Sequence, residues 1–234
     1  MEKEVQKQNK LKRIQDFRFL SENAYEIIKE AIIGLKFAPG EKLNLAKITD
    51  ELGISATPVR EAMNRLIQEG FVVNNPYKGA FVSNVDDKMV VQLAELRELL
   101  EVAAIRRTAA QFTASDAKAG EELIEKLEKA YKKNDVTSYV EYSMQFHNMF
   151  IDRCGNEMMA NVMRGFTDHV KRIAFLALGR LGKISPFIED YKNILEAAKN
   201  RDPEEAGRRL LDHLRNVRHA FNQKDSVTPG RKTI

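Results

Sequence analysis

The fold of the first part of the chain is decided by the stretch Leu45-Ala46-Lys47-Ile48-Thr49-Asp50-Glu51-Leu52-Gly53-Ile54-Ser55-Ala56-Thr57-Pro58-Val59-Arg60-Glu61-Ala62. This stretch predicts two short helices, over 45–52 and 56–69, joined by a tight turn at Gly53, as in a helix-turn-helix. Ser55 is placed to cap the second helix, and Pro58 falls in its first turn, where a missing N–H costs little.

The second predicted helix has two faces of different chemistry. Apolar residues recur at the three- and four-residue spacing of a buried helix face. The opposite face is polar, and its side chains are of the types that bind DNA. Such a face is also typical of any solvated amphipathic helix, so periodicity alone does not decide between the two. The apolar positions are Val59, Ala62, Met63, Leu66 and Ile67, and the polar positions are Thr57, Arg60, Glu61, Asn64, Arg65 and Gln68.

The residues after this helix predict a β-hairpin, which favours DNA binding over a merely solvated face. Phe71-Val72-Val73 and Ala80-Phe81-Val82 flank a turn at 74–79. Arg60 can contact guanine or phosphate through its planar fork, and Asn64 can read adenine. We therefore predict a winged helix-turn-helix over 21–85. Its expected DNA-binding residues are Ser55, Thr57, Arg60, Asn64, Arg65, Lys78 and Gly79.

From Asp86 onward the sequence predicts only amphipathic helices, and Ser115 is a candidate N-cap. Six helices of this length suit an all-α bundle with a buried pocket. The chain is thus expected to be mainly α, with tails at 1–20 and 223–234. The N-terminal tail is either an arm that touches DNA phosphates or a solvated leader. The predicted helices of the second domain, 86–222, are 86–111, 115–133, 136–153, 157–179, 186–200 and 203–222.

Composition and charge exclude several classes of protein. The 234 residues carry a net charge of +4, but residues 1–20 hold six basic and three acidic side chains, so bulk charge is no argument for DNA. A single cysteine, Cys154, excludes an internal disulfide framework and a cysteine-based zinc site. The charged N-terminus is no secretory signal, and no apolar run approaches the ~18 residues of a membrane span. We expect a soluble, cytoplasmic protein.

The first domain resembles the DNA-binding domain of GntR-family transcription regulators. The resemblance rests on Pro39-Gly40-Glu41-Lys42-Leu43, on 55–63 and on Lys78-Gly79-Ala80-Phe81-Val82. It implies a regulator, usually a repressor, that binds a palindromic DNA operator as a homodimer. In the family, arginine usually follows the serine of the turn, and here that residue is Ala56. The difference affects the expected operator sequence and not DNA binding, because Arg60 and Lys78 keep their family positions.

The second domain resembles the FCD effector domain of the FadR subfamily, in its six-helix, VanR-like branch. The resemblance rests on Arg97-Glu98-Leu99-Leu100-Glu101, on Phe146-His147 with Cys154-Gly155-Asn156, and on Tyr191-Lys192-Asn193-Ile194-Leu195-Glu196-Ala197 with His213-Leu214. It implies that a small carboxylate or other organic acid binds this domain and controls operator affinity. The expected effector-binding residues are Arg97, Ser143, His147, Asn156, Tyr191 and His213.

Many FCD domains hold a divalent metal with one Asp and three His, and here two of those four positions are Ser143 and Tyr191. Only His147 and His213 remain, and two imidazoles without a carboxylate make a weak site. We therefore expect no cofactor and a metal-free pocket in which Arg97 binds the acid. The alternative is a divalent metal held by His147 and His213, with His169 or a nearby carboxylate as a substitute ligand. In the opposing interpretation, Arg97 only pairs with Glu101 and His213 is a core histidine.

Two other functions compete with an effector-controlled regulator. The helical domain could serve only to dimerise a DNA-binding protein, without a ligand cavity. It could instead be a metal-dependent helical enzyme, a hypothesis that only His147 and His213 support. No HExxH motif, Gly-x-Ser-x-Gly motif or Gly-rich phosphate loop is present in the sequence. We therefore expect a regulator and not an enzyme.

Overall fold

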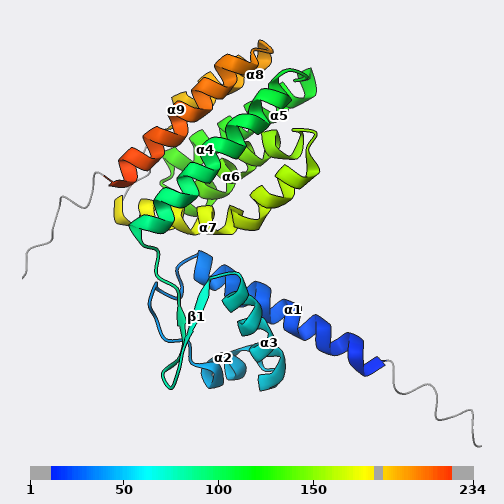
Figure 1. Cartoon of the computed structure of the whole chain (residues 1–234), viewed down its shortest axis with the longest axis vertical. Helices are drawn as coiled ribbons and strands as arrows, with labels where there is room; N and C mark the ends of the chain where they lie inside the picture. The colour runs from blue at the N-terminus through cyan, green and yellow to red at the C-terminus, as the bar shows by residue number, and fades with distance from the viewer. Residues whose placement is uncertain (1–11, 182–186, 223–234) are drawn as a thin grey trace, which may run out of the picture. The chain divides into compact units, whose positions relative to one another are not determined.

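The computed structural model describes residues 12–181 and 187–222. The chain divides into two compact units, Met1–Val85 and Asp86–Ile234, and each is described by itself (Figure 1). The expected C-terminal tail at 223–234 lies outside the described residues.

The first unit is a winged helix-turn-helix, as predicted. Its first helix begins at Lys12, inside the stretch that the sequence predicts as a tail, and the other elements lie within about two residues of their predicted places. The order of elements is α1 (Lys12–Ile33), α2 (Leu45–Leu52), α3 (Ala56–Gln68), β1 (Val72–Asn75) and β2 (Gly79–Val82).

Three residues mark the two ends of α2 and the start of α3. Asn44 caps α2 by accepting a hydrogen bond from the backbone N–H of Lys47. Gly53 ends α2 in the left-handed conformation, at φ 63°, which glycine adopts without strain. Ser55 stands at the N-cap of α3, but its side chain makes no capping hydrogen bond, so the predicted cap is wrong in this respect.

The hairpin packs on the helices through its inward-facing residues. β1 and β2 are antiparallel, and Val72 pairs with Val82. Both valines are buried, as are Val59 and Leu66 on the predicted apolar face of α3. Lys42 forms an isolated bridge with Phe81, so a second lysine lies beside the wing.

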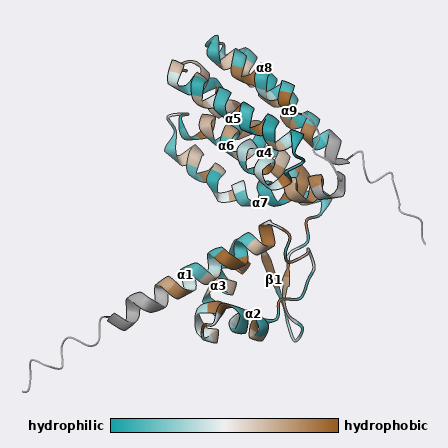
Figure 2. Ribbon diagram, turned by 180° about the vertical axis from the view of Figure 1, so that it is seen from behind, coloured by the Kyte–Doolittle hydropathy of each residue, from teal (hydrophilic) through white to brown (hydrophobic). Residues whose placement is uncertain are grey.

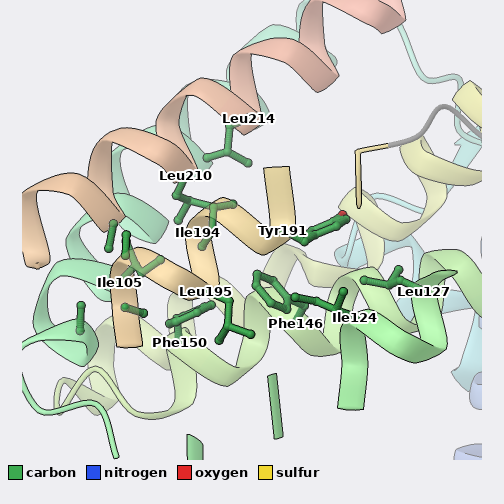
Figure 3. Packing of buried hydrophobic residues seen from close by; sticks show 14 of the residues in the cluster. Ile105, Ile124, Leu127, Phe146, Phe150, Tyr191, Ile194, Leu195, Leu210 and Leu214 are labelled. Carbon is green, nitrogen blue, oxygen red and sulfur yellow. The ribbon is translucent and has the colours of Figure 1, made fainter. Parts of the chain in front are cut away.

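The second unit is a bundle of six helices in its described part, as predicted. In Figure 2 polar and apolar residues alternate along its outer helices, as amphipathic helices require. Figure 3 shows the core that their apolar sides form, with Phe146, Ile194 and Leu210 among its residues. The helices are α4 (Asp87–Ala109), α5 (Ala114–Lys132), α6 (Val136–Asp152), α7 (Glu157–Leu181), α8 (Ile188–Lys199) and α9 (Pro203–Asn222).

The start of α5 corrects one detail of the prediction. Thr113, and not Ser115, caps the helix, and it forms a reciprocal capping box with Asp116. None of the helices in the described part of the chain is long and apolar enough to span a bilayer.

Candidate DNA-binding surface and effector pocket

The exposed face of α3 carries most of the predicted DNA-binding residues. Thr57, Arg60 and Asn64 are exposed at the spacing that places them on one side of the helix, and Ser55 is exposed at its start. Arg60 has no ion-pair or hydrogen-bond partner among the described residues. The N-terminus of α3 adds partial positive charge, so this face suits a phosphate backbone and base edges.

Arg65 lies on a different side of α3 and contacts α1. Its Nη1 atom donates to Glu22 Oε2 at 2.5 Å, and its guanidinium lies 3.8 Å from the centre of the Tyr25 ring. These contacts hold α3 against α1. The structure therefore does not bring Arg65 together with Arg60 and Asn64, although the sequence predicts all three as DNA-binding residues.

The wing presents the other two predicted DNA-binding residues. Lys78 and Gly79 lie at the end of the hairpin, where Lys78 is exposed and Gly79 has φ 99°. The Cε atom of Lys42 lies 3.6 Å from where a side chain on Gly79 would begin. The wing therefore carries a second cation, Lys42, which the sequence analysis did not assign to DNA binding.

The helical unit contains a cavity of about 110 Å³. Five of the six predicted effector-binding residues line it. They come from four helices: Arg97 from α4, Ser143 and His147 from α6, Tyr191 from α8 and His213 from α9.

Asn156, the sixth predicted effector-binding residue, has a different role in the structure. Its Oδ1 atom accepts a hydrogen bond from the backbone N–H of Met159 at 3.1 Å, at the start of α7. It is not among the residues that line the cavity. This asparagine therefore caps a helix and does not border the pocket.

A buried carboxylate, Glu101, connects two of the cavity residues. Arg97 donates to it from Nε at 2.5 Å and from Nη2 at 3.4 Å, and His147 donates from Nδ1 at 2.7 Å. Burial alone would raise the pKa of Glu101, but the charges of Arg97 and His147 and their hydrogen bonds lower it to about 2. Glu101 is thus ionised, and it fixes the orientation of both partners.

The other side of the cavity contains hydroxyl and imidazole groups. Ser143 Oγ and the Tyr191 hydroxyl lie 2.7 Å apart, and His213 Nδ1 lies 3.1 Å from Asp190 Oδ2. Burial lowers the pKa of His213 to about 4, although Asp190 opposes the shift, and burial raises the pKa of Tyr191 to about 12. Both rings are therefore neutral at pH 7.

The remaining wall of the cavity is apolar. It is built mainly by α4 and α7, which face the polar groups of α6, α8 and α9. A cavity divided in this way fits a small molecule that has one polar end and one apolar part. The apolar residues include Val90, Leu93, Met144, Val170, Ile173 and Ala177.

The donor set of the cavity does not fit the metal site of FCD domains. His147 and His213 are each oriented by a carboxylate, which is the arrangement of a metal-binding histidine. Ser143 and Tyr191, however, place hydroxyls at the other two positions and hydrogen-bond to each other. Within the described residues, no group of three or more His, Cys, Asp or Glu side chains is placed to hold a metal ion.

Two further residues of this site, Glu101 and Asp190, are not among the effector-binding residues predicted from the sequence. Glu101 is one turn after Arg97 on α4, and this spacing favours a pair between the two residues. Asp190 directly precedes Tyr191 in the sequence. Both are carboxylates that orient a histidine of the cavity.

Comparisons with known proteins agree with this two-part architecture. Residues 20–82 match the family described as bacterial regulatory proteins, gntR family, and residues 92–216 match the FCD domain. The two matches fall within the winged helix-turn-helix unit and the helical unit, respectively.

Curated relatives and solved structures are similar along most of their length. The HTH-type transcriptional repressor RspR of Escherichia coli K12 is 21% identical over 204 residues, which are 87% of this chain and 90% of RspR. The regulator McbR of the same strain is 25% identical over 71% of this chain and 76% of its own.

Two solved structures share the fold at low sequence identity. E. coli McbR/YncC has a TM-score of 0.75 at 23% identity, over 88% of this chain and 98% of its own. A putative GntR regulator from Rhodococcus sp. RHA1 has a TM-score of 0.76 at 20% identity, over 87% and 98%. The DNA-binding unit, the helical unit and both family matches lead to one conclusion: the chain belongs to the GntR family of DNA-binding transcription regulators, carries an FCD domain, and is not an enzyme.

Proposed function

We propose that this regulator is a repressor that binds a palindromic operator as a homodimer in the cytoplasm. In this proposal a small organic acid, held in the cavity of the helical unit without a metal, controls operator affinity. The observation that carries the proposal is the cavity itself, because Arg97, Ser143, His147, Tyr191 and His213 all line it. A unit that served only to dimerise would have no use for buried polar groups around a hollow.

Arg97 can still bind an anion although it is paired. The hydrogen bonds of Arg97 to Glu101 and His147 within the described residues use its Nε and Nη2 atoms, so Nη1 remains available to an anion. The Ser143–Tyr191 pair uses one hydroxyl hydrogen for its own hydrogen bond and leaves the other free to donate to an acid in the cavity. The apolar wall would take the rest of the acid, so a compact acid with an aliphatic or aromatic part fits best.

Helix α4 offers a route from the cavity to DNA. Only residues 83–86 separate β2 of the wing from α4 along the chain, and the first turns of α4 supply Val90, Leu93 and Arg97 to the cavity. An effector that contacts these residues would bias the position of α4. A coupling free energy of about 1–3 kcal/mol between effector and operator is typical of such regulators.

The experiment that tests this proposal combines thermal unfolding with DNA binding. The full chain is screened against a panel of small carboxylates, and operator affinity is measured on a duplex that the wild-type protein selects from a random pool. We expect one acid to raise the unfolding midpoint and to weaken operator binding. Ala177→Leu should fill the cavity and abolish both effects, whereas Ala119→Leu, at an exposed position of α5, should change neither.

Two results would contradict the proposal. If no acid of the panel shifts the unfolding midpoint and A177L leaves DNA binding unchanged, the helical unit serves dimerisation alone. If the acid acts equally on wild type and A177L, it binds outside this cavity. Elution of the DNA-bound form as a monomer in size-exclusion chromatography would contradict the homodimer.

A further inference from the structure

The tip of the wing contains a backbone conformation that its residue does not favour. The backbone N–H of Lys78 donates to the carbonyl of Asn75 at 3.1 Å, which closes a four-residue turn around Pro76 and Tyr77. Tyr77, at the third position of this turn, has φ 64°. Proline at the second position with positive φ at the third is the pattern of a type II turn, in which the third residue is normally glycine or asparagine.

This tyrosine differs from the other described non-glycine residues with positive φ. Leu35, Asn134 and Arg201 also have positive φ, and each lies two residues after the last residue of a helix. The left-handed conformation at a helix end lets a backbone N–H satisfy the last carbonyls, so it has a structural reason there. Tyr77 follows no helix, and glycine would form its turn with less strain.

No contact within the described residues stabilises the ring of Tyr77. It is 109% exposed, which is full exposure, and it makes no hydrogen bond or ring contact with the described residues. The surrounding side chains are polar or cationic: Asn75, Lys78 and Lys42 are exposed at the same end of the hairpin. An aromatic ring held in solvent at a strained position beside lysines indicates a contact outside this unit.

We infer that Tyr77 is a DNA-contacting residue of the wing. Its ring would lie against the sugars of the groove that the wing enters, and its hydroxyl would donate to a phosphate oxygen. Lys78, the next residue, would neutralise a neighbouring phosphate. The inference rests on the DNA binding of this family and adds a residue to it, because Arg60, Asn64 and Lys78 are the contacts expected from the sequence.

The test uses glycine at this position, because glycine favours the turn and removes the ring. Full-length wild type and Tyr77→Gly are titrated against a duplex of about three helical turns that wild type selects from a random pool. We expect Y77G to bind about tenfold more weakly. Its thermal unfolding midpoint should not fall, because the turn is relieved of strain.

Three further proteins separate the possible causes. Tyr77→Phe removes only the hydroxyl, and we expect a loss of about threefold in affinity. Lys78→Ala should reduce the salt dependence of binding by about one ion, whereas Y77G should leave that dependence unchanged, since it removes no charge. Tyr131→Ala, at a partly exposed tyrosine of α5, should bind within about twofold of wild type and serves as the matched control.

Failure of this inference differs from failure of DNA binding itself. If wild type selects a duplex and Y77G binds it within about twofold of wild type, Tyr77 does not contact DNA. If Y77G loses affinity together with a lower unfolding midpoint or a smaller oligomer, the ring stabilises the protein or its assembly, and the inference is wrong. If wild type enriches no sequence, DNA recognition fails as a whole.

Discussion

The hydroxyls of Ser143 and Tyr191 lie 2.7 Å apart and hydrogen-bond to each other, although α6 and α8 are separate elements of the chain. Both side chains line the cavity, and both stand where many FCD domains place a metal ligand. Two hydroxyls that satisfy each other form a neutral pair, which removes the need for a cation between them. The pair thus offers a physical reason for a metal-free pocket.

Restoring the two metal ligands should create a metal site. In the double variant Ser143→Asp with Tyr191→His, one carboxylate and three imidazoles would surround the cavity, which is a suitable donor set for a divalent transition metal. We expect this variant to bind about one Zn²⁺ per chain in equilibrium dialysis followed by elemental analysis. Its thermal unfolding midpoint should rise with zinc.

The single variant S143D is the control for this experiment. It buries a carboxylate without completing the site, so it should lose stability and hold little zinc. Wild-type protein purified without chelator should contain far less than one metal ion per chain. A stoichiometric metal in wild type would show that His147 and His213 recruit other ligands, and the metal-free pocket would then be wrong.

Glu101 should be essential for the stability of the helical unit, because its carboxylate balances the charge of the buried Arg97 guanidinium. It is 3% exposed, and it accepts hydrogen bonds from both Arg97 and His147. Glu101→Gln leaves the guanidinium without its counter-charge, so we expect a loss of about 3–5 kcal/mol in the free energy of unfolding of the helical unit. Urea unfolding followed by circular dichroism measures this loss.

The double variant Arg97→Met with Glu101→Leu tests whether the cause is charge. It removes both charges and keeps similar volume, and we expect it to be more stable than E101Q. If the double variant is the less stable of the two, Arg97 and Glu101 contribute packing that the apolar pair does not replace. The single variants Arg97→Met and Glu101→Leu complete the comparison. If their losses in the free energy of unfolding add up to the loss of the double variant, the two residues are not energetically coupled.

The sequence predicts the helices well and their ends less well. The apolar spacing of α3 is strong because one face of the helix is buried, as at Val59 and Leu66. The cap of α5 was misplaced because Thr113 and Ser115 are both good cap residues, and only the position of Asp116 decides between them. The sequence does not predict the start of α1 at Lys12, because the charged residues of 1–20 are typical of a solvated tail.

The sequence predicts the cavity residues but not their partners. Ser143, His147, Tyr191 and His213 were found through their family positions, and the structure places them together. Glu101 is 46 residues away from His147, so no local pattern can pair them. Arg65 is predicted from its place on the polar face of α3, but its contact with Glu22 of α1 depends on packing between segments 43 residues apart. Asn156 is predicted from its family position, but its side chain caps the start of α7, three residues before Met159.

The buried histidine His213 should make the helical unit sensitive to mild acid. Burial lowers its pKa from 6.5 to about 4, with Asp190 opposing and the neighbouring His147 and Arg97 reinforcing the shift. Between these two values the unfolded chain binds a proton that the folded chain does not. The free energy of unfolding should therefore fall as the pH drops from 6.5 to 4, by at most about 3 kcal/mol.

Replacing this histidine isolates its contribution. His213→Gln can still donate to Asp190 but does not titrate, so its stability should change less than that of wild type between pH 6.5 and 4. His219→Gln, at an exposed histidine, should follow the wild-type curve. Glu101 has a folded pKa of about 2, so its contribution to stability begins to fall only below pH 4.5, and H213Q and wild type share that fall. Parallel curves for H213Q and wild type would contradict the prediction.

Replacing the two arginines of α3 should affect different properties: Arg60 should matter for operator affinity and Arg65 for stability. Arg60 is exposed without a partner among the described residues, so Arg60→Ala should cost about 1–3 kcal/mol in operator binding and leave stability nearly unchanged. Arg65 lies on Tyr25 and pairs with Glu22, so Arg65→Ala should cost about 1 kcal/mol of stability. Its effect on DNA binding should be smaller than that of R60A.

Fluorescence anisotropy on the selected duplex and thermal unfolding measure both quantities on the same samples. Each variant is the control for the other, because both remove one positive charge from the same helix. Nonspecific attraction to phosphate would weaken R60A and R65A equally. Equal losses would therefore show that α3 contributes only general charge, whereas a larger loss for R60A identifies the face of α3 that touches the operator.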